Sequence, residues 1–128
     1  MESTIVMSGI LTKRISRFKS AKFMFTLLSS EPANLYYICK LDYDQLKIKN
    51  VLDRDTWHKY NLREMCIMRS KGERDKFYLI SQDKKSLETD GTVHIVVQAE
   101  NKTTRDRWVS VLNHSKSRTV VSVPPDYQ

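Results

Sequence analysis

Residues 103–112 read TTRDRWVSVL, and this stretch predicts a C-terminal helix that can cover the core formed by the rest of the chain. Apolar or small side chains recur at i, i+3, i+4 and i+7, namely Trp108, Val111, Leu112 and Ser115. This spacing places an indole and two aliphatic groups on one stripe of a helix. Asn101, Thr103 or Thr104 can cap the start, because a side-chain oxygen there accepts from an otherwise unpaired backbone N–H.

The chain ahead of this helix consists of short strand-like segments separated by polar loops. The seven segments are residues 8–16, 23–28, 35–41, 46–51, 63–68, 76–80 and 92–99. Residues 29–34 (SSEPAN) predict a turn, and residues 42–44 (DYD) predict a break. Seven strands followed by one helix predict a mainly β fold, an antiparallel barrel or sandwich capped by the C-terminal α-helix.

Length and composition favour one small domain. The chain has 128 residues, of which 40% are hydrophobic, enough for one modest core. We expect an N-terminal extension at residues 1–7, the domain at 8–117 and a flexible tail at 118–128. No apolar run approaches the ~20 residues that span a bilayer, and no secretory signal is visible, so a soluble cytoplasmic protein is expected.

The positive charge is concentrated in one segment. The net charge is +7, and residues 13–22 contain five basic residues and no acidic one. These residues are Lys13, Arg14, Arg17, Lys19 and Lys22. Such clustering creates a local positive field. A second basic cluster, within residues 69–76, is diluted by Glu73 and Asp75, and we interpret it as a solvated hairpin loop that turns at Gly72.

Three segments, in this order, resemble the pleckstrin homology domain family over residues 8–115. Gly9-Ile10-Leu11-Thr12-Lys13 is similar to the Gly-x-Leu-x-Lys start of that family. FMFTL and LYYICK, from residues 23 and 35, resemble its Trp-Phe-x-Leu and Leu-Tyr-Tyr-x-x-Lys strands. The single helical Trp108, followed by aliphatic residues, resembles its helix, so Gly9 and Trp108 are expected to have structural roles.

The resemblance implies a non-catalytic module that binds phosphoinositides or other anionic lipid head groups through its basic first hairpin. Lys13 stands at the position of the family's first lysine, and Tyr37 stands where a hydroxyl can reach a phosphate. Phe23 replaces the family's arginine, which implies modest selectivity, because phenylalanine cannot supply a bidentate fork. The candidate head-group residues are therefore Lys13, Arg14, Arg17, Lys19, Lys22 and Tyr37.

Two placements of the head group remain open, inside the first hairpin or on its outer side, where Arg14 and Lys22 face it. Because Lys13 lies on a strand, whereas Lys71 lies in a loop beside Glu73, Lys13→Ala is predicted to weaken vesicle binding more than Lys71→Ala. The implied protein is a signalling adaptor, peripheral at the inner face of membranes. The alternative is a protein–protein interaction module with little or no lipid binding.

Other classes of function have little support in the sequence. No catalytic triad pattern, Gly-rich phosphate loop or metal-ligand spacing is present, so no enzyme, cofactor or metal is expected. Cys39 and Cys66 are interpreted as reduced thiols. No nucleic-acid partner is expected, because the aromatic residues must build the core, and a monomer is expected. Pro124, Pro125 and Tyr127 fit Pro-Pro-x-Tyr, a possible ligand of a WW domain.

Overall fold

The computed structural model describes residues 4–46, 56–81 and 94–118, and it contains a single seven-stranded antiparallel sheet. The strands are β1 (Ile5–Ser16), β2 (Lys19–Leu28), β3 (Glu31–Cys39), β4 (His58–Asn61), β5 (Met65–Arg69), β6 (Lys76–Ser81) and β7 (His94–Gln98). The helices are α1 (Lys40–Leu46), the short 3₁₀ helix η2 (Leu62–Glu64) and α3 (Lys102–Ser117). The predicted mainly β fold with a C-terminal helix is confirmed.

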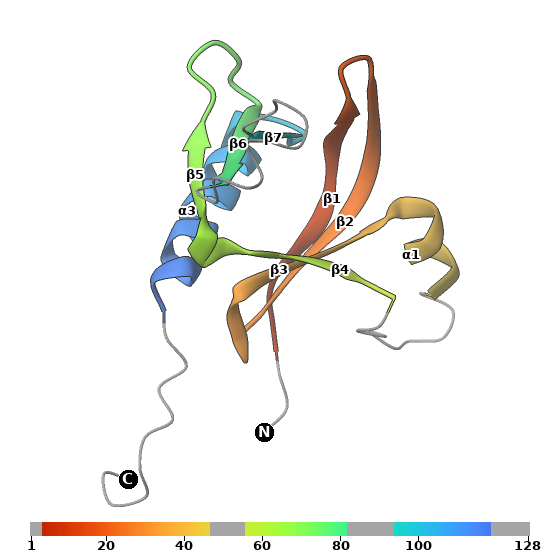
Figure 1. Ribbon diagram of the computed structural model, residues 1–128, viewed down its shortest axis with the longest axis vertical. Helices are drawn as coiled ribbons and strands as arrows, with labels where there is room; N and C mark the ends of the chain where they lie inside the picture. The colour runs from red at the N-terminus through yellow and green to blue at the C-terminus, as the bar shows by residue number, and fades with distance from the viewer. Residues whose placement is uncertain (1–3, 47–55, 82–93, 119–128) are drawn as a thin grey trace, which may run out of the picture.

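The order of the strands in the sheet is β4-β3-β2-β1-β7-β6-β5. β1 and β2 form a long hairpin, whereas β1 meets β7 through only two residue pairs, Thr12↔Gln98 and Lys13↔Val97. This short pairing joins two halves, β1–β4 and β5–β7, which enclose the core together with α3 (Figure 1). It also sets the hairpin of β1 and β2 beside the hairpin of β5 and β6.

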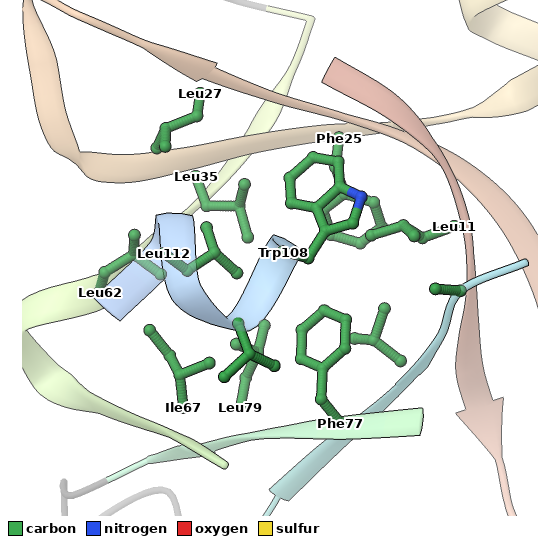
Figure 2. Packing of buried hydrophobic residues seen from close by; sticks show 13 residues of the cluster. Leu11, Phe25, Leu27, Leu35, Leu62, Ile67, Phe77, Leu79, Trp108 and Leu112 are labelled. Atoms are coloured by element: carbon green, nitrogen blue, oxygen red, sulfur yellow. The ribbon is translucent and has the colours of Figure 1, made fainter. Parts of the chain in front are cut away.

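Helix α3 covers the core as its apolar stripe predicts. The Asn101 side chain accepts from Thr104 N at 2.8 Å, which confirms one of the three predicted caps. Trp108 and Leu112 are fully buried, and the Trp108 ring meets Phe25 edge to face at 6.5 Å (Figure 2). Ser115 at the end of the stripe donates to the Pro32 carbonyl at 2.6 Å. The helix therefore contacts both halves of the sheet.

The segment after β3 differs from the prediction. Residues 42–44 were predicted to be a break and residues 46–51 a strand, but Lys40–Leu46 forms helix α1. Lys40 and Asp44 are paired at 2.8 Å at i,i+4, and Tyr43 and Leu46, three residues apart, pack on the outer cluster that contains Trp57. Contacts between residues three and four apart stabilise a helix here, whereas the short alternation from residue 46 predicted a strand. The other residues of the predicted strand, 47–51, lie outside the described residues.

The fourth strand and the turn before β3 also differ from the prediction. The fourth strand is His58–Asn61, which the sequence did not predict as a strand. The predicted turn at residues 29–34 is shorter in the structure and consists of Ser29 and Ser30, since β3 already begins at Glu31. The pairing of β3 with β2 is irregular at this point, between Leu27 and Leu28. Pro32 has no ladder partner in that irregular stretch, so its missing N–H costs the sheet no hydrogen bond.

None of the helices in the described ranges is long and apolar enough to cross a membrane. Within the same ranges, no cluster of three His, Cys, Asp or Glu side chains has the arrangement of a metal site. Cys39 and Cys66 are both half-buried.

Candidate functional site

A groove of about 920 Å³ lies between the β1–β2 hairpin and the β5–β6 hairpin, and we call it the hairpin groove. Figure 1 shows the tips of both hairpins at the same end of the molecule, and β7 lies between the two hairpins in the sheet. The first hairpin contributes Thr12, Arg14, Arg17, Phe18, Lys19 and Ser20. The second contributes Met68, Arg69, Ser70, Lys71, Gly72, Glu73, Lys76, Tyr78 and Ile80, and β7 adds Val96 and Gln98.

The alternation of the strands decides which side chains reach this groove. Arg14 pairs with Ser20 across the first hairpin, and both line the groove together with Thr12. Lys13, the next residue along the strand, points to the opposite face of the sheet. The same rule acts in β6, where Lys76 and Tyr78 line the groove while Phe77 between them is buried in the core.

The hairpin groove is strongly cationic. Six basic residues line it, three from each hairpin, and Glu73 is the only carboxylate among the described lining residues. Glu73 pairs with Lys76 at 2.7 Å, and Arg69 lies 3.4 Å from Asp106 on α3. Lys19 and Lys71 form no ion pair with any described residue, so their ammonium groups remain available to an anion.

Lys13 and Tyr37 occupy a different environment, on the inner face of the first half of the sheet. Tyr37 stacks on Tyr60 with ring centroids 4.3 Å apart, and Phe23 meets Tyr37 edge to face at 6.0 Å. The Lys13 ammonium lies over all three rings, 4.5 Å from the Tyr37 centroid, 5.1 Å from Phe23 and 5.3 Å from Tyr60. Phe23 thus forms part of a cation–π site for Lys13.

Burial shifts the pKa values of Lys13 and Tyr60. It lowers the pKa of Lys13, because the charged ammonium loses part of its hydration. It raises the pKa of Tyr60, and the neighbouring Tyr37 raises that pKa further through a hydrogen bond and its charge. The hydroxyl of Tyr60 therefore stays protonated at neutral pH.

The tip of the first hairpin exposes apolar surface beside the groove. The Phe18 side chain is 93% exposed, and the Arg17 guanidinium lies 5.8 Å from its ring centroid. Ile15, at the end of β1, is 52% exposed. A cationic groove bordered by an exposed aromatic side chain has both features that a membrane interface attracts, positive charge and an apolar ring.

The structure separates the six predicted head-group residues into three positions. Arg14, Arg17 and Lys19 line the hairpin groove. Lys13 and Tyr37 lie together on the inner face. Lys22 is exposed on β2, next to Thr12 in the ladder, but it does not line the groove. The predicted ligand Pro124-Pro125-Asp126-Tyr127 for a WW domain lies outside the described residues and stays a prediction.

The second hairpin is absent from the head-group site that the sequence predicts. Arg69, Lys71 and Lys76 were interpreted as part of a solvated loop, yet all three line the groove. The alternation of Lys76 and Tyr78 with the apolar Phe77 and Leu79 is the signal that could have placed Lys76 and Tyr78 on one face of the predicted strand. Only the β1–β7 pairing shows that this face lies beside the first hairpin.

Comparisons with known proteins identify the fold through structure alone. The sequence matches no model of a protein family, and no curated protein matches it either. The C-terminal PH domain of pleckstrin in complex with D-myo-Ins(1,2,3,5,6)P5 superposes with a TM-score of 0.62 and 20% sequence identity, over 91% of this chain and 99% of that one. A second crystal structure of the same PH domain superposes with a TM-score of 0.60 and 21% identity, over 88% of this chain and 98% of that one.

A second group of similar structures contains this fold within longer chains. The DH/PH fragment of PDZ-RhoGEF, solved in complex with human RhoA, superposes with a TM-score of 0.64 and 16% identity over 89% of this chain. This chain spans 29% of the length of that one. Both groups superpose on about nine-tenths of this chain, and the chain therefore has the pleckstrin homology domain fold.

Proposed function

We propose that this domain is a non-catalytic membrane-targeting module that binds phosphoinositide head groups in the hairpin groove. The observation that carries the proposal is that six basic residues, three from each of two hairpins, line one groove beside the exposed Phe18. This is the outer of the two placements that the sequence left open. The PH domain of pleckstrin, solved with an inositol pentakisphosphate, supports the class of ligand.

The chemistry of the groove suits phosphate groups. Arg14 and Arg17 can each offer a planar fork of N–H donors to phosphate oxygens, and such charge-assisted hydrogen bonds are short and strong. Lys19 and Lys71 add charges that no described acid neutralises. Each basic residue near an anionic surface contributes about 1 kcal/mol, so recruitment depends on several of them acting together.

The inner face is a poorer site for a head group in this proposal. Lys13 already has three aromatic rings as partners, and a phosphate would have to draw its ammonium away from them. We therefore expect Lys13 to contribute less than Lys71, the reverse of what the sequence alone predicts.

Vesicle sedimentation at near-physiological salt tests the function. We expect the wild-type domain to bind phosphatidylcholine vesicles that contain a polyphosphoinositide and to stay in solution with phosphatidylcholine alone. Equal binding to both kinds of vesicle, or binding to neither, would refute the proposal and favour a protein–protein interaction module.

A charge-matched pair of variants tests the site. Lys71→Gln removes one charge from the groove, and Lys59→Gln removes one exposed charge from β4, at the far edge of the sheet. Lys71→Gln should weaken vesicle binding several-fold more than Lys59→Gln or Lys13→Met. Equal losses from the Lys71 and Lys59 variants would mean that only total charge matters.

A further inference from the structure

The β1–β2 hairpin extends beyond the rest of the sheet as a two-stranded arm. The pairing of β1 with β7 ends at Lys13, and the pairing of β2 with β3 begins at Phe23. Among the described strands, residues 14–20 therefore have ladder partners only within the hairpin, and all seven are exposed. Because a two-stranded hairpin by itself is only marginally stable in water, this arm can open locally without unfolding the core.

Ser20 lies on this arm and faces the hairpin groove. It pairs with Arg14 in the ladder, and both residues line the groove. Side chains at paired positions of an antiparallel ladder lie next to each other on the same face, so the Ser20 hydroxyl lies beside the Arg14 side chain. Ser16 is also exposed, but it does not line the groove. Ser20 is therefore the serine of the arm whose modification would change the groove from within.

The residues around Ser20 suit a protein kinase that selects basic substrates. Arg17 lies three residues before Ser20, Lys19 one residue before it and Lys22 two residues after it, and residues 13–22 contain no acidic side chain. A kinase with an acidic substrate cleft attracts such a segment through charge complementarity. Local opening of the arm supplies the extended backbone that the cleft needs. The kinase then transfers the γ-phosphoryl group of ATP to the Ser20 hydroxyl oxygen, which loses its proton, and ADP leaves.

We propose that Ser20 is a phosphorylation site and that its phosphate switches off anion binding in the hairpin groove. At neutral pH the phosphate adds a charge of about −1.5 to −2 and three strong acceptor oxygens. Beside Arg14, Arg17 and Lys19, it accepts the same charge-assisted hydrogen bonds that a phosphate of the ligand would accept. It thus occupies part of the groove and cancels part of its positive field. This inference rests on the proposed function of the groove.

Two glutamate variants separate occupation of the groove from a general loss of positive charge. Ser20→Glu and Ser16→Glu each add one negative charge to the same arm, but only Ser20 lines the groove. Isothermal titration of the 128-residue chain with inositol hexakisphosphate measures the affinity, and circular dichroism melts check that each variant folds. We expect Ser20→Glu to weaken binding about five- to tenfold and Ser16→Glu about twofold or less. Equal losses from the two variants, or no loss from Ser20→Glu, would overturn the proposal.

Enzymatic phosphorylation tests the site itself and does not depend on the folding of a variant. The wild-type chain is incubated with ATP and a serine kinase that selects arginine three residues before its target, and mass spectrometry locates the phosphate. We expect phosphate on Ser20 and release of the phosphorylated chain from polyphosphoinositide vesicles. An unmodified Ser20, or a phosphorylated chain that binds the vesicles as tightly as before, would overturn the proposal. A wild-type chain that binds neither inositol hexakisphosphate nor these vesicles would instead refute the proposed function of the groove.

Discussion

At the scale of single residues, Lys13 shows how its neighbours can change the role of a basic side chain. Two opposed effects act on its ammonium. Burial lowers the pKa of Lys13, whereas the ring faces of Phe23, Tyr37 and Tyr60 favour the charged form by about 0.5–2 kcal/mol in total. We expect burial to prevail, so NMR titration of the Lys13 side chain should give a pKa below the ordinary lysine value of 10.5.

This pKa has a consequence for stability. The unfolded chain holds the Lys13 proton more tightly than the folded chain does. The contribution of Lys13 to the free energy of unfolding should therefore increase as the pH rises from the lowered pKa to 10.5, and urea unfolding of Lys13→Met should lack that increase. A pKa at or above the ordinary value would show that the rings outweigh burial.

At the scale of elements, α3 is the part of the fold that stability depends on most directly. Trp108→Ala should lower the free energy of unfolding by about 3–5 kcal/mol, because it removes a fully buried indole from the centre of the core. That is a large part of the ~5–15 kcal/mol that a small domain has. Urea unfolding measures it, and an unchanged midpoint would mean that α3 does not cover the core.

Gly9→Ala is the matched control, because Gly9 lies against the same ring. A Cβ at Gly9 would lie 3.5 Å from Trp108 Cζ2, an ordinary contact distance. The free energy of unfolding should therefore change by less than about 1 kcal/mol. A loss as large as that of Trp108→Ala would show that the ring has no room for the added methyl group.

The elements that the sequence predicted well are those whose pattern is local. The stripe of α3, its Asn101 cap and the apolar residues of β6 are each contained in a few consecutive residues. Helix α1 was not predicted, because Tyr43 and Leu46 pack in one cluster with the buried Trp57, which lies more than ten residues further along the chain. A seven-residue helix has too few turns for its own spacing to predict it.

At the scale of the whole molecule, the hairpin groove was not predictable from the sequence. It exists because two residue pairs between β1 and β7 bring together hairpins that are about fifty residues apart in the chain. Local patterns identified the basic residues of both hairpins, but no local pattern states which hairpins are neighbours. The resemblance to the pleckstrin homology family predicted the fold, because a known fold supplies the long-range strand pairing that local patterns lack.

The central claim is that a phosphorylated inositol ligand binds between the two hairpins and not on the inner face. An ¹H–¹⁵N NMR titration with inositol hexakisphosphate tests it directly, because each backbone amide reports its own surroundings. The account predicts that the largest shifts fall on residues 17–20 and 70–73, one set from each hairpin. Shifts centred on Phe23, Tyr37 and Tyr60, with residues 70–73 unmoved, would contradict it.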